Sequence, residues 1–231
     1  EIISQSKPKS ETVIICAPYL QASYDKLIFC MDQFSFLSIY EKLPPAELKL
    51  KNSIKLNIPN VKGMAMNQNY LAITYSGAKK EQLKGVLKSM NLSGILLYRR
   101  DQHVICTVHE KILNLPDGEA FKNISSITMN EKYLYACDRE LKKVFQFDLK
   151  SGLMINKIKN EDDEPICISA NQNYLVTFDS FNSNLNLYDY EQLELLNSTC
   201  IRNIDKTNGN LSILINEDDL IFVKNSDYQV T

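Results

Sequence analysis

Three aspartates recur where short apolar runs end, and they are the first candidates for chemistry in this sequence. They are Asp32, Asp138 and Asp179. Carboxylates that converge on one point can bind Ca²⁺, and a bound metal ion can activate water for ester or lactone hydrolysis. An Asp that ends the same strand in each repeat is more simply a cap that accepts hydrogen bonds from a turn. We expect turn caps, with calcium-dependent hydrolysis as the less favoured alternative.

Other signatures of catalysis are missing from the sequence. It contains no phosphate-binding glycine loop, no G-x-S-x-G elbow and no HExxH motif. Six Cys without a CxxC pair and only two His argue against a zinc site. His103 and His109 point to one side of an alternating run and Cys106 to the other, which excludes a Cys–His dyad. We expect no enzyme activity, no metal site and no cofactor.

Positive charge gathers in the middle of the chain. Residues 79–159 contain 15 Lys or Arg against 9 Asp or Glu, whereas the rest contains 11 against 19. Such an asymmetry can create local fields that a net charge of −2 hides. The candidates for binding a partner protein or RNA are six cations and one loop aromatic: Lys79, Lys80, Lys84, Arg139, Lys142, Lys143 and Phe181.

The elements that must position these residues come from a hairpin pattern that the chain repeats. Each copy alternates, turns at an Asn and alternates again, and the Asn residues are 63, 41 and 45 positions apart. A Leu stands four residues after each Asn, and in three copies a Tyr precedes that Leu. Asn tolerates a positive φ angle, so we expect these Asn residues to adopt positive φ in tight turns. The copies are centred on Asn67, Asn130, Asn171 and Asn216, with a degenerate copy around Leu27.

Two further alternating runs follow each hairpin and complete a unit of four short strands. The third run carries an aromatic, as in "VFQFDLKSG" (144–152), and the fourth resembles "HVICTVH" (103–109) or "LMINKI" (153–158). A repeated unit of four strands in about 40–45 residues is typical of a β-propeller blade. The recurring Tyr and Leu are then expected to pack between neighbouring blades. The sequence predicts an all-β propeller with second strands near residues 27–31, 70–74, 133–137, 174–178 and 220–224.

The predicted blade resembles the NHL repeat, whose core reads "x-Leu-Tyr-Val-x-Asp", a polar loop and then "φ-x-φ-Phe/Tyr-Asp-x-x-Gly". The best match is "YLYACDRELKKVFQFDLKSG" (133–152), and "YLVTFDSFNSNLNLYDY" (174–190) also matches well. The resemblance covers roughly residues 13–231 and departs from the pattern in its first copy and in its seven Gly. The lack of Trp argues against WD repeats.

This resemblance implies a ring of six blades, of which about five are visible. Residues 1–231 are expected to form one propeller domain, most simply a fragment of a longer protein. An open ring, or a last blade completed by strands from the beginning of the chain, would also fit. In the tripartite-motif NHL proteins that it resembles, the propeller follows a RING finger and recruits substrates for ubiquitin transfer, or binds RNA. We therefore expect a non-catalytic platform for a protein partner, with RNA binding as the alternative.

An insertion, "SGAKKEQLKGVLKSMNLSG" (76–94), interrupts the second visible blade. Its apolar residues recur at helical spacing, which predicts a short helix on the loop between the second and third strands. The same loop of the next blade is the basic "RELKK" (139–143), while the acidic "NEDDE" (160–164) leads into the blade after it. Equivalent loops leave a propeller on one face, so we expect that face to be basic on one side and acidic on the other.

The Cys residues lie mostly inside apolar runs, where reduced thiols behave as small hydrophobic side chains. We therefore expect a reducing, cytoplasmic setting. No apolar run approaches the length that a membrane helix needs, and we expect no membrane partner.

Overall fold

The fold was analysed in a computed structural model of the chain. The structure describes residues 20–24, 27–31, 36–44, 47–56, 58, 60–75, 93–101, 104–105, 109–159, 164–201, 211–216, 218–219 and 221–225. These residues are almost all in strands or in the turns that join them.

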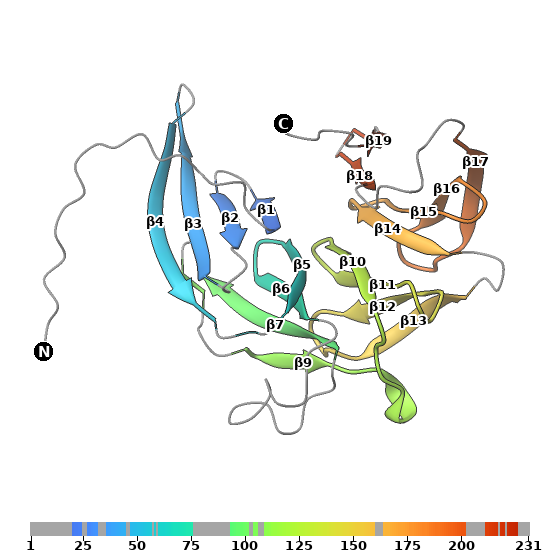
Figure 1. The fold of residues 1–231 in the computed structure, drawn as a ribbon, viewed down its shortest axis with the longest axis horizontal. Coiled ribbons are helices and arrows are strands. Elements are labelled where there is room, and N and C mark those ends of the chain that lie inside the picture. Colours follow the sequence, from blue (N-terminus) through green and yellow to red (C-terminus); the bar gives the residue numbers. More distant parts are fainter. Residues whose placement is uncertain are drawn as a thin grey trace, which may run out of the picture.

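The described strands form five antiparallel sheets, which succeed one another in chain order around a common centre (Figure 1). We call these sheets blades 1 to 5. Blade 1 comprises β1 (Leu20–Tyr24), β2 (Leu27–Met31), β3 (Phe36–Leu43) and β4 (Glu47–Lys55). Blade 2 comprises β5 (Val61–Met66), β6 (Tyr70–Tyr75), β7 (Gly94–Asp101), β8 (Val104–Ile105) and β9 (Lys111–Leu113). A single turn of 3-10 helix, η1 (Pro116–Gly118), precedes blade 3.

Blades 3 and 4 are the most regular copies. Blade 3 comprises β10 (Ile124–Met129), β11 (Tyr133–Asp138), β12 (Lys143–Asp148) and β13 (Met154–Lys159). Blade 4 comprises β14 (Pro165–Ala170), β15 (Tyr174–Asp179), β16 (Asn184–Asp189) and β17 (Leu195–Cys200). Blade 5 has two described strands, β18 (Leu211–Ile215) and β19 (Ile221–Asn225). The predicted propeller-like, all-β fold is confirmed, and β2, β6, β11, β15 and β19 lie where the five second strands were expected.

The outer edge of blade 2 differs from the prediction of one continuous strand over residues 103–109. Among the described residues, Val104 and Ile105 pair with the end of β7, and Lys111–Leu113 pairs with its beginning. The described part of the outer strand therefore forms two segments, and His109 and Glu110 between them are not in a strand. The predicted helical insertion falls on residues 76–94, of which 76–92 lie outside the described residues and Gly94 begins β7.

The repeated Leu and Tyr pack between blades, as predicted, and they face in opposite directions. Leu134 on β11 packs toward blade 2, whereas Tyr133 packs toward blade 4. In blades 2, 3 and 4 the repeated Leu is paired across the sheet with the aromatic of the third strand, as Leu134 is with Phe147. Leu71 and Leu175 are likewise fully buried and face the preceding blade. Burial of a Leu stabilises the fold by about 1.5–3 kcal/mol, so this register helps to fix the order of the blades.

The turn asparagines do not have the positive φ that was expected of them. The described non-Gly residues with positive φ are Asn60, Asp117, Lys142, Ser183, Leu193 and Asp219. The Asn side chains instead form turns, since Asn130 Oδ1 accepts hydrogen bonds from the backbone N–H groups of Lys132 and Tyr133 at 3.0 and 2.8 Å. Asn67 and Asn171 make the same pair of bonds.

The amide group of each turn Asn also reaches the next blade. Nδ2 of Asn67 donates to the carbonyl O of Asn130 at 2.8 Å, and Nδ2 of Asn130 donates to that of Asn171 at 3.2 Å. Asn171 continues the series to the carbonyl of Asn216 at 2.8 Å. At its beginning, Nη1 of the buried Arg100 donates to the carbonyl of Asn67 at 2.7 Å. We call this row the asparagine ladder, and it joins blades 2 to 5 near the centre of the fold.

Candidate functional site

The loops that join the second strand of a blade to its third lie at the end of the blades opposite the Asn turns. In blades 3 and 4 these loops are residues 139–142 and 180–183, and the segments that lead into each blade end beside them. We call this surface the docking face. It holds all the described residues that the sequence suggested for binding.

Asp138 fixes the loop of blade 3. Its carboxylate accepts hydrogen bonds from the backbone N–H groups of Glu140 and Leu141 at 3.1 and 3.0 Å. The same carboxylate accepts the N–H groups of Lys122 and Asn123, which lead into the blade, at 2.8 and 3.1 Å. Asp138 is fully buried, so a single side chain holds two segments of the docking face in place.

Asp179 does the same for blade 4. Its carboxylate accepts the N–H groups of Phe181 and Asn182 at 2.9 and 3.1 Å, and that of Glu164 at 2.7 Å. This geometry confirms the expectation that the repeated Asp caps turns. Asp32 lies outside the described residues.

The cations of the docking face are partly neutralised by the chain itself. Arg139 Nε lies 2.6 Å from Glu164 Oε1, and Lys143 Nζ lies 2.9 Å from Glu119 Oε1. The hydrogen bond from Lys143 holds the pKa of Glu119 below its ordinary value. The basic loop therefore meets acidic groups of the neighbouring segments instead of forming a continuous positive surface.

Two candidates remain at the surface of this face. Lys142 is exposed, with φ of 53°, and Phe181 is 70% exposed at the tip of its loop. Lys79, Lys80 and Lys84, which were expected to extend the basic side, lie outside the described residues, as does most of the acidic segment before Glu164.

A small hollow opens on the docking face between blades 3 and 4. Its cavity volume is about 10 Å³, which is room for about one water molecule. It is lined by Lys142, Val144, Ile158, Pro165, Thr177, Asp179, Asn186 and Tyr188. The blade 3 side is therefore aliphatic apart from Lys142, whereas blade 4 contributes three polar side chains beside Pro165 and Tyr188.

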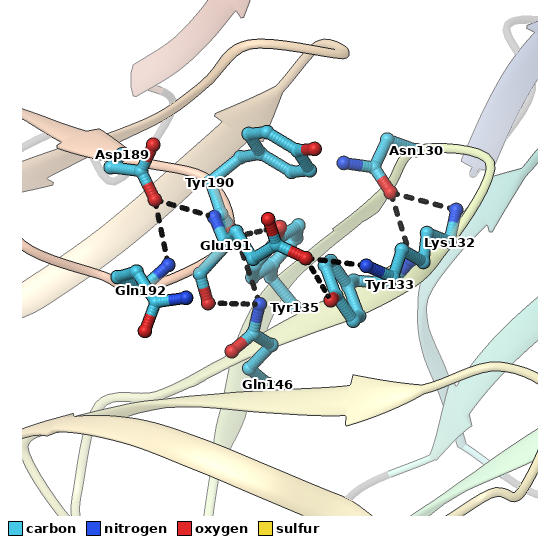
Figure 2. A network of polar contacts seen from close by, with 9 residues as sticks. All are labelled: Asn130, Lys132, Tyr133, Tyr135, Gln146, Asp189, Tyr190, Glu191 and Gln192. Carbon is cyan, nitrogen blue, oxygen red and sulfur yellow. Dashed lines mark hydrogen bonds and ion pairs between the residues drawn. The ribbon is translucent and has the colours of Figure 1, made fainter.

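A polar network joins blades 3 and 4 on the opposite face, where the Asn turns lie (Figure 2). The ammonium of Lys132 and the hydroxyl of Tyr133 both donate to Oε1 of Glu191, and the distance from the Tyr133 hydroxyl is 3.1 Å. The Lys132 ammonium also lies 4.8 Å from the centre of the Tyr133 ring. Asp189 shapes the turn that carries Glu191, because its Oδ1 accepts the N–H groups of Glu191 and Gln192 at 2.9 and 2.7 Å.

Next to this ion pair, side chains of blade 3 donate hydrogen bonds to the backbone of the same turn. The hydroxyl of Tyr135 and Nε2 of Gln146 both donate to the carbonyl O of Tyr190, Gln146 at 2.8 Å (Figure 2). Burial raises the pKa of Tyr135, so its hydroxyl stays protonated and remains a donor. We call these contacts between blades 3 and 4 the inter-blade clamp. The sequence pattern gave no sign of it because the partners lie 44 to 59 residues apart in the chain.

The clamp predicts a stability difference that depends on pH. The hydrogen bond from Lys132 holds the pKa of Glu191 below its ordinary value. The ion pair between Lys132 and Glu191 therefore stabilises the fold fully above the ordinary Glu pKa of about 4.3. This stabilisation is lost as the pH falls through the lower pKa that Glu191 has in the folded state. Glu191→Gln should lower the Tm at pH 7 and lower it by less at pH 3, as measured by thermal unfolding at both values.

Glu194, which is exposed in the same turn, supplies the control for this experiment. Glu194→Gln should leave the Tm nearly unchanged at either pH. An effect of Glu191→Gln that is equally large at pH 3 would show that the ion pair with Lys132 does not carry the contribution.

The described His and Cys residues that could take part in chemistry are packed against other side chains or lie apart from one another. The ring of His109 stacks edge-on against Tyr98, with centroids 6.2 Å apart, while His103 and Cys106 lie outside the described residues. Cys30, Cys137 and Cys167 are buried free thiols, and burial raises the pKa of Cys137 to about 12. Over the described ranges, no three His, Cys, Asp or Glu side chains are grouped so that they could hold a metal ion. No described helix is long and apolar enough to cross a membrane.

Comparison with known proteins gives the fold and no more. No family model and no curated protein matches the chain. Among solved structures, the chain is similar to the computationally designed Ika8 protein, with a TM-score of 0.55 and 7% sequence identity. The match covers 89% of this chain and 57% of that one, so the chain spans little more than half of its length. At this identity the likeness concerns the fold alone, and it agrees with the propeller-like arrangement of β-blades.

Proposed function

We propose that the chain is a non-catalytic propeller that recruits a protein partner on the docking face. The observation that carries this proposal is Phe181, a large aromatic side chain that is 70% exposed on a loop pinned by a buried carboxylate. Aromatic side chains are enriched among the residues that dominate protein interfaces. A loop that is already ordered also loses less conformational freedom when it binds.

The ion pairs that Arg139 and Lys143 already make within the chain favour a protein partner over RNA. Arg139 and Lys143 each lie within ion-pair distance of a carboxylate of this chain, so a phosphate would have to compete with Glu164 and Glu119. A protein surface that bears both signs of charge would complement this mixed face better than a uniform polyanion. RNA binding remains the alternative function, supported by the exposed Lys142 and by Phe181 on the same face, an aromatic side chain that could stack on a base.

The resemblance to NHL repeats extends the proposal to a biological setting. On that resemblance, the recruited protein would be a substrate for ubiquitin transfer by a tripartite-motif ligase. This extension rests on residues 133–152 and 174–190, the two stretches that match the repeat best.

The proposal can be tested by selecting binders from a displayed library of protein fragments and measuring their affinity for two variants. Phe181→Ser should weaken the selected binders at least about tenfold, the effect typical of a central aromatic contact. Leu153→Ser is the matched control, because Leu153 is also exposed, at 66%, but lies in the turn between β12 and β13 on the opposite face.

Binders that respond equally to both variants, or to neither, would contradict the proposed face. The RNA alternative has its own measurement, retention of a random single-stranded RNA pool at about 50 and 200 mM salt. Retention that collapses with salt and with Lys142→Glu and Lys143→Glu, in a protein that selects no protein fragments, would replace the proposal by RNA binding.

A further inference from the structure

The outer strands of blades 1, 3 and 4 share a side-chain contact that the proposed function does not use. β4, β13 and β17 each lie at the end of a sheet, so one edge of each pairs with no other described strand. In each of them an Asn Oδ1 accepts the backbone N–H of the next residue. These contacts, which we call the edge caps, join Asn52 to Ser53 at 2.8 Å, Asn156 to Lys157 at 2.9 Å and Asn197 to Ser198 at 2.8 Å.

Each edge cap stands at the same point of its strand. The pairing with the third strand shifts directly before the Asn, so that Lys51, Ile155 and Leu196 are the extra residues of three β-bulges. A bulge bends and twists a strand, and natural edge strands use it to turn away from an incoming strand. Because bulge and Asn occur together in three blades, the pair is a feature of the repeated unit.

The N–H group that Asn197 caps points away from blade 4. The N–H of Ile201 donates to the carbonyl of Ser183 at 2.8 Å, so these two residues form a hydrogen-bonded pair. Bonded and non-bonded pairs alternate along an antiparallel ladder, which makes Asn186 and Ser198 a non-bonded pair. The N–H of Ser198 therefore faces the open edge, where the carbonyl of an added strand could accept it. The exposed side chain of Asn197 occupies that acceptor position instead.

The three strands differ in a second form of edge protection, which is charge. Lys side chains keep an edge strand from pairing with a copy of itself, because like charges would lie opposite each other. β4 contains three Lys and β13 contains two, whereas β17, "LLNSTC", contains no charged residue. At blade 4 the bulge and the edge cap of Asn197 therefore act without the help of charge.

We propose that the edge caps keep these outer edges closed to an added strand, and that Asn197 holds closed a pairing surface for a second copy of this chain. Two copies of β17 that meet antiparallel around a two-fold axis present the same backbone groups to each other, and they bring no like charges together. The edge cap of blade 4 is thus an autoinhibitory contact, and it lies on an edge strand and not on the loops of the docking face.

Asn197→Ala tests the proposal, because it removes the cap without adding a large apolar side chain. In sedimentation velocity, its average mass should rise with concentration towards about twice that of the unchanged chain. Thr199→Ala is the matched control, since Thr199 is exposed on the same strand but its N–H belongs to a bonded pair with Leu185 and points to β16. Its mass should equal that of the unchanged chain. Asn52→Ala removes a cap from the Lys-rich β4 and should also leave the mass unchanged at low salt.

Amide hydrogen exchange at Ser198 locates the association. In dilute Asn197→Ala this N–H should exchange about fivefold faster than in the unchanged chain, the factor that corresponds to one ordinary hydrogen bond. It should become protected again as the concentration rises and pairs form. A mass of Asn197→Ala that stays equal to that of the unchanged chain would overturn the proposal. So would an equal rise in Thr199→Ala, or a rise that leaves Ser198 unprotected, since the copies would then meet at another surface.

Discussion

Asp138→Ala is expected to lower the free energy of unfolding by about 3 kcal/mol, a large share of the 5–15 kcal/mol that typically stabilises a folded domain. The carboxylate accepts four backbone N–H groups, from Lys122, Asn123, Glu140 and Leu141. Ala offers none of them an acceptor, and the side chain that it replaces is fully buried. Some of these N–H groups would turn to water, which keeps the expected loss below four full desolvation penalties. Chemical denaturation followed by circular dichroism measures the loss.

Two further variants test whether the loss comes from capping. Asp138→Asn keeps one oxygen but places an NH₂ group against N–H donors, so it should give an intermediate loss. Glu140→Ala changes an exposed neighbour in the same loop and should stay within about 0.5 kcal/mol. A loss below about 1 kcal/mol for Asp138→Ala would contradict the capping role. Calcium that raises the Tm of the unchanged chain but not of Asp138→Ala would instead identify a metal ligand and revive the hydrolase alternative.

The architecture could be predicted because its signals are local. Alternation with a period of two marks each strand, and the Leu that faces the preceding blade stands next to the Tyr that faces the following one. The capping role of Asp179 was also predictable, because an Asp at a strand end bonds to N–H groups two and three residues later. These features depend on neighbours within one hairpin, so the pattern alone was sufficient.

The sequence could not predict contacts whose two partners lie on different blades or segments. Arg139 looked like part of a basic surface, but its partner Glu164 is 25 residues further on. The split outer strand of blade 2 depends on which residues reach β7 after a long connection, and alternation favoured one unbroken run instead.

The asparagine ladder shows most clearly where pattern reading failed. Positive φ explains many turn asparagines, but Asn130 is used for its side-chain amide, whose acceptor belongs to Asn171, 41 residues away. The recurrence of Asn at one position of four hairpins, and not of Gly or Asp, was the available signal. Gly would serve positive φ equally well, whereas only an amide supplies both the turn acceptor and the donor to the next blade.

Asn130→Ala is expected to lower the free energy of unfolding by about 3 kcal/mol, because this one side chain makes hydrogen bonds both within its own turn and to the next blade. Its Oδ1 accepts two N–H groups within the turn, and its Nδ2 donates to the carbonyl of Asn171 in blade 4. Asn130 is only 4% exposed, so water cannot readily replace these partners. The same residue also receives the amide of Asn67 on its backbone carbonyl, a bond that the substitution leaves in place.

Equilibrium unfolding in urea, monitored by tyrosine fluorescence and by circular dichroism, measures this loss. Gln172→Ala, at the exposed position that follows Asn171 in the corresponding turn of blade 4, should stay within about 0.5 kcal/mol. The ladder further predicts that Asn130→Ala and Asn171→Ala are not additive. Asn171→Ala keeps the carbonyl that accepts from Asn130 but loosens the turn that positions it, so it weakens the same inter-blade bond that Asn130→Ala removes. Strict additivity in the double variant would mean that the Asn turns of blades 3 and 4 act independently of each other. A double variant that loses less than the sum would show that the turns act as one unit from blade to blade.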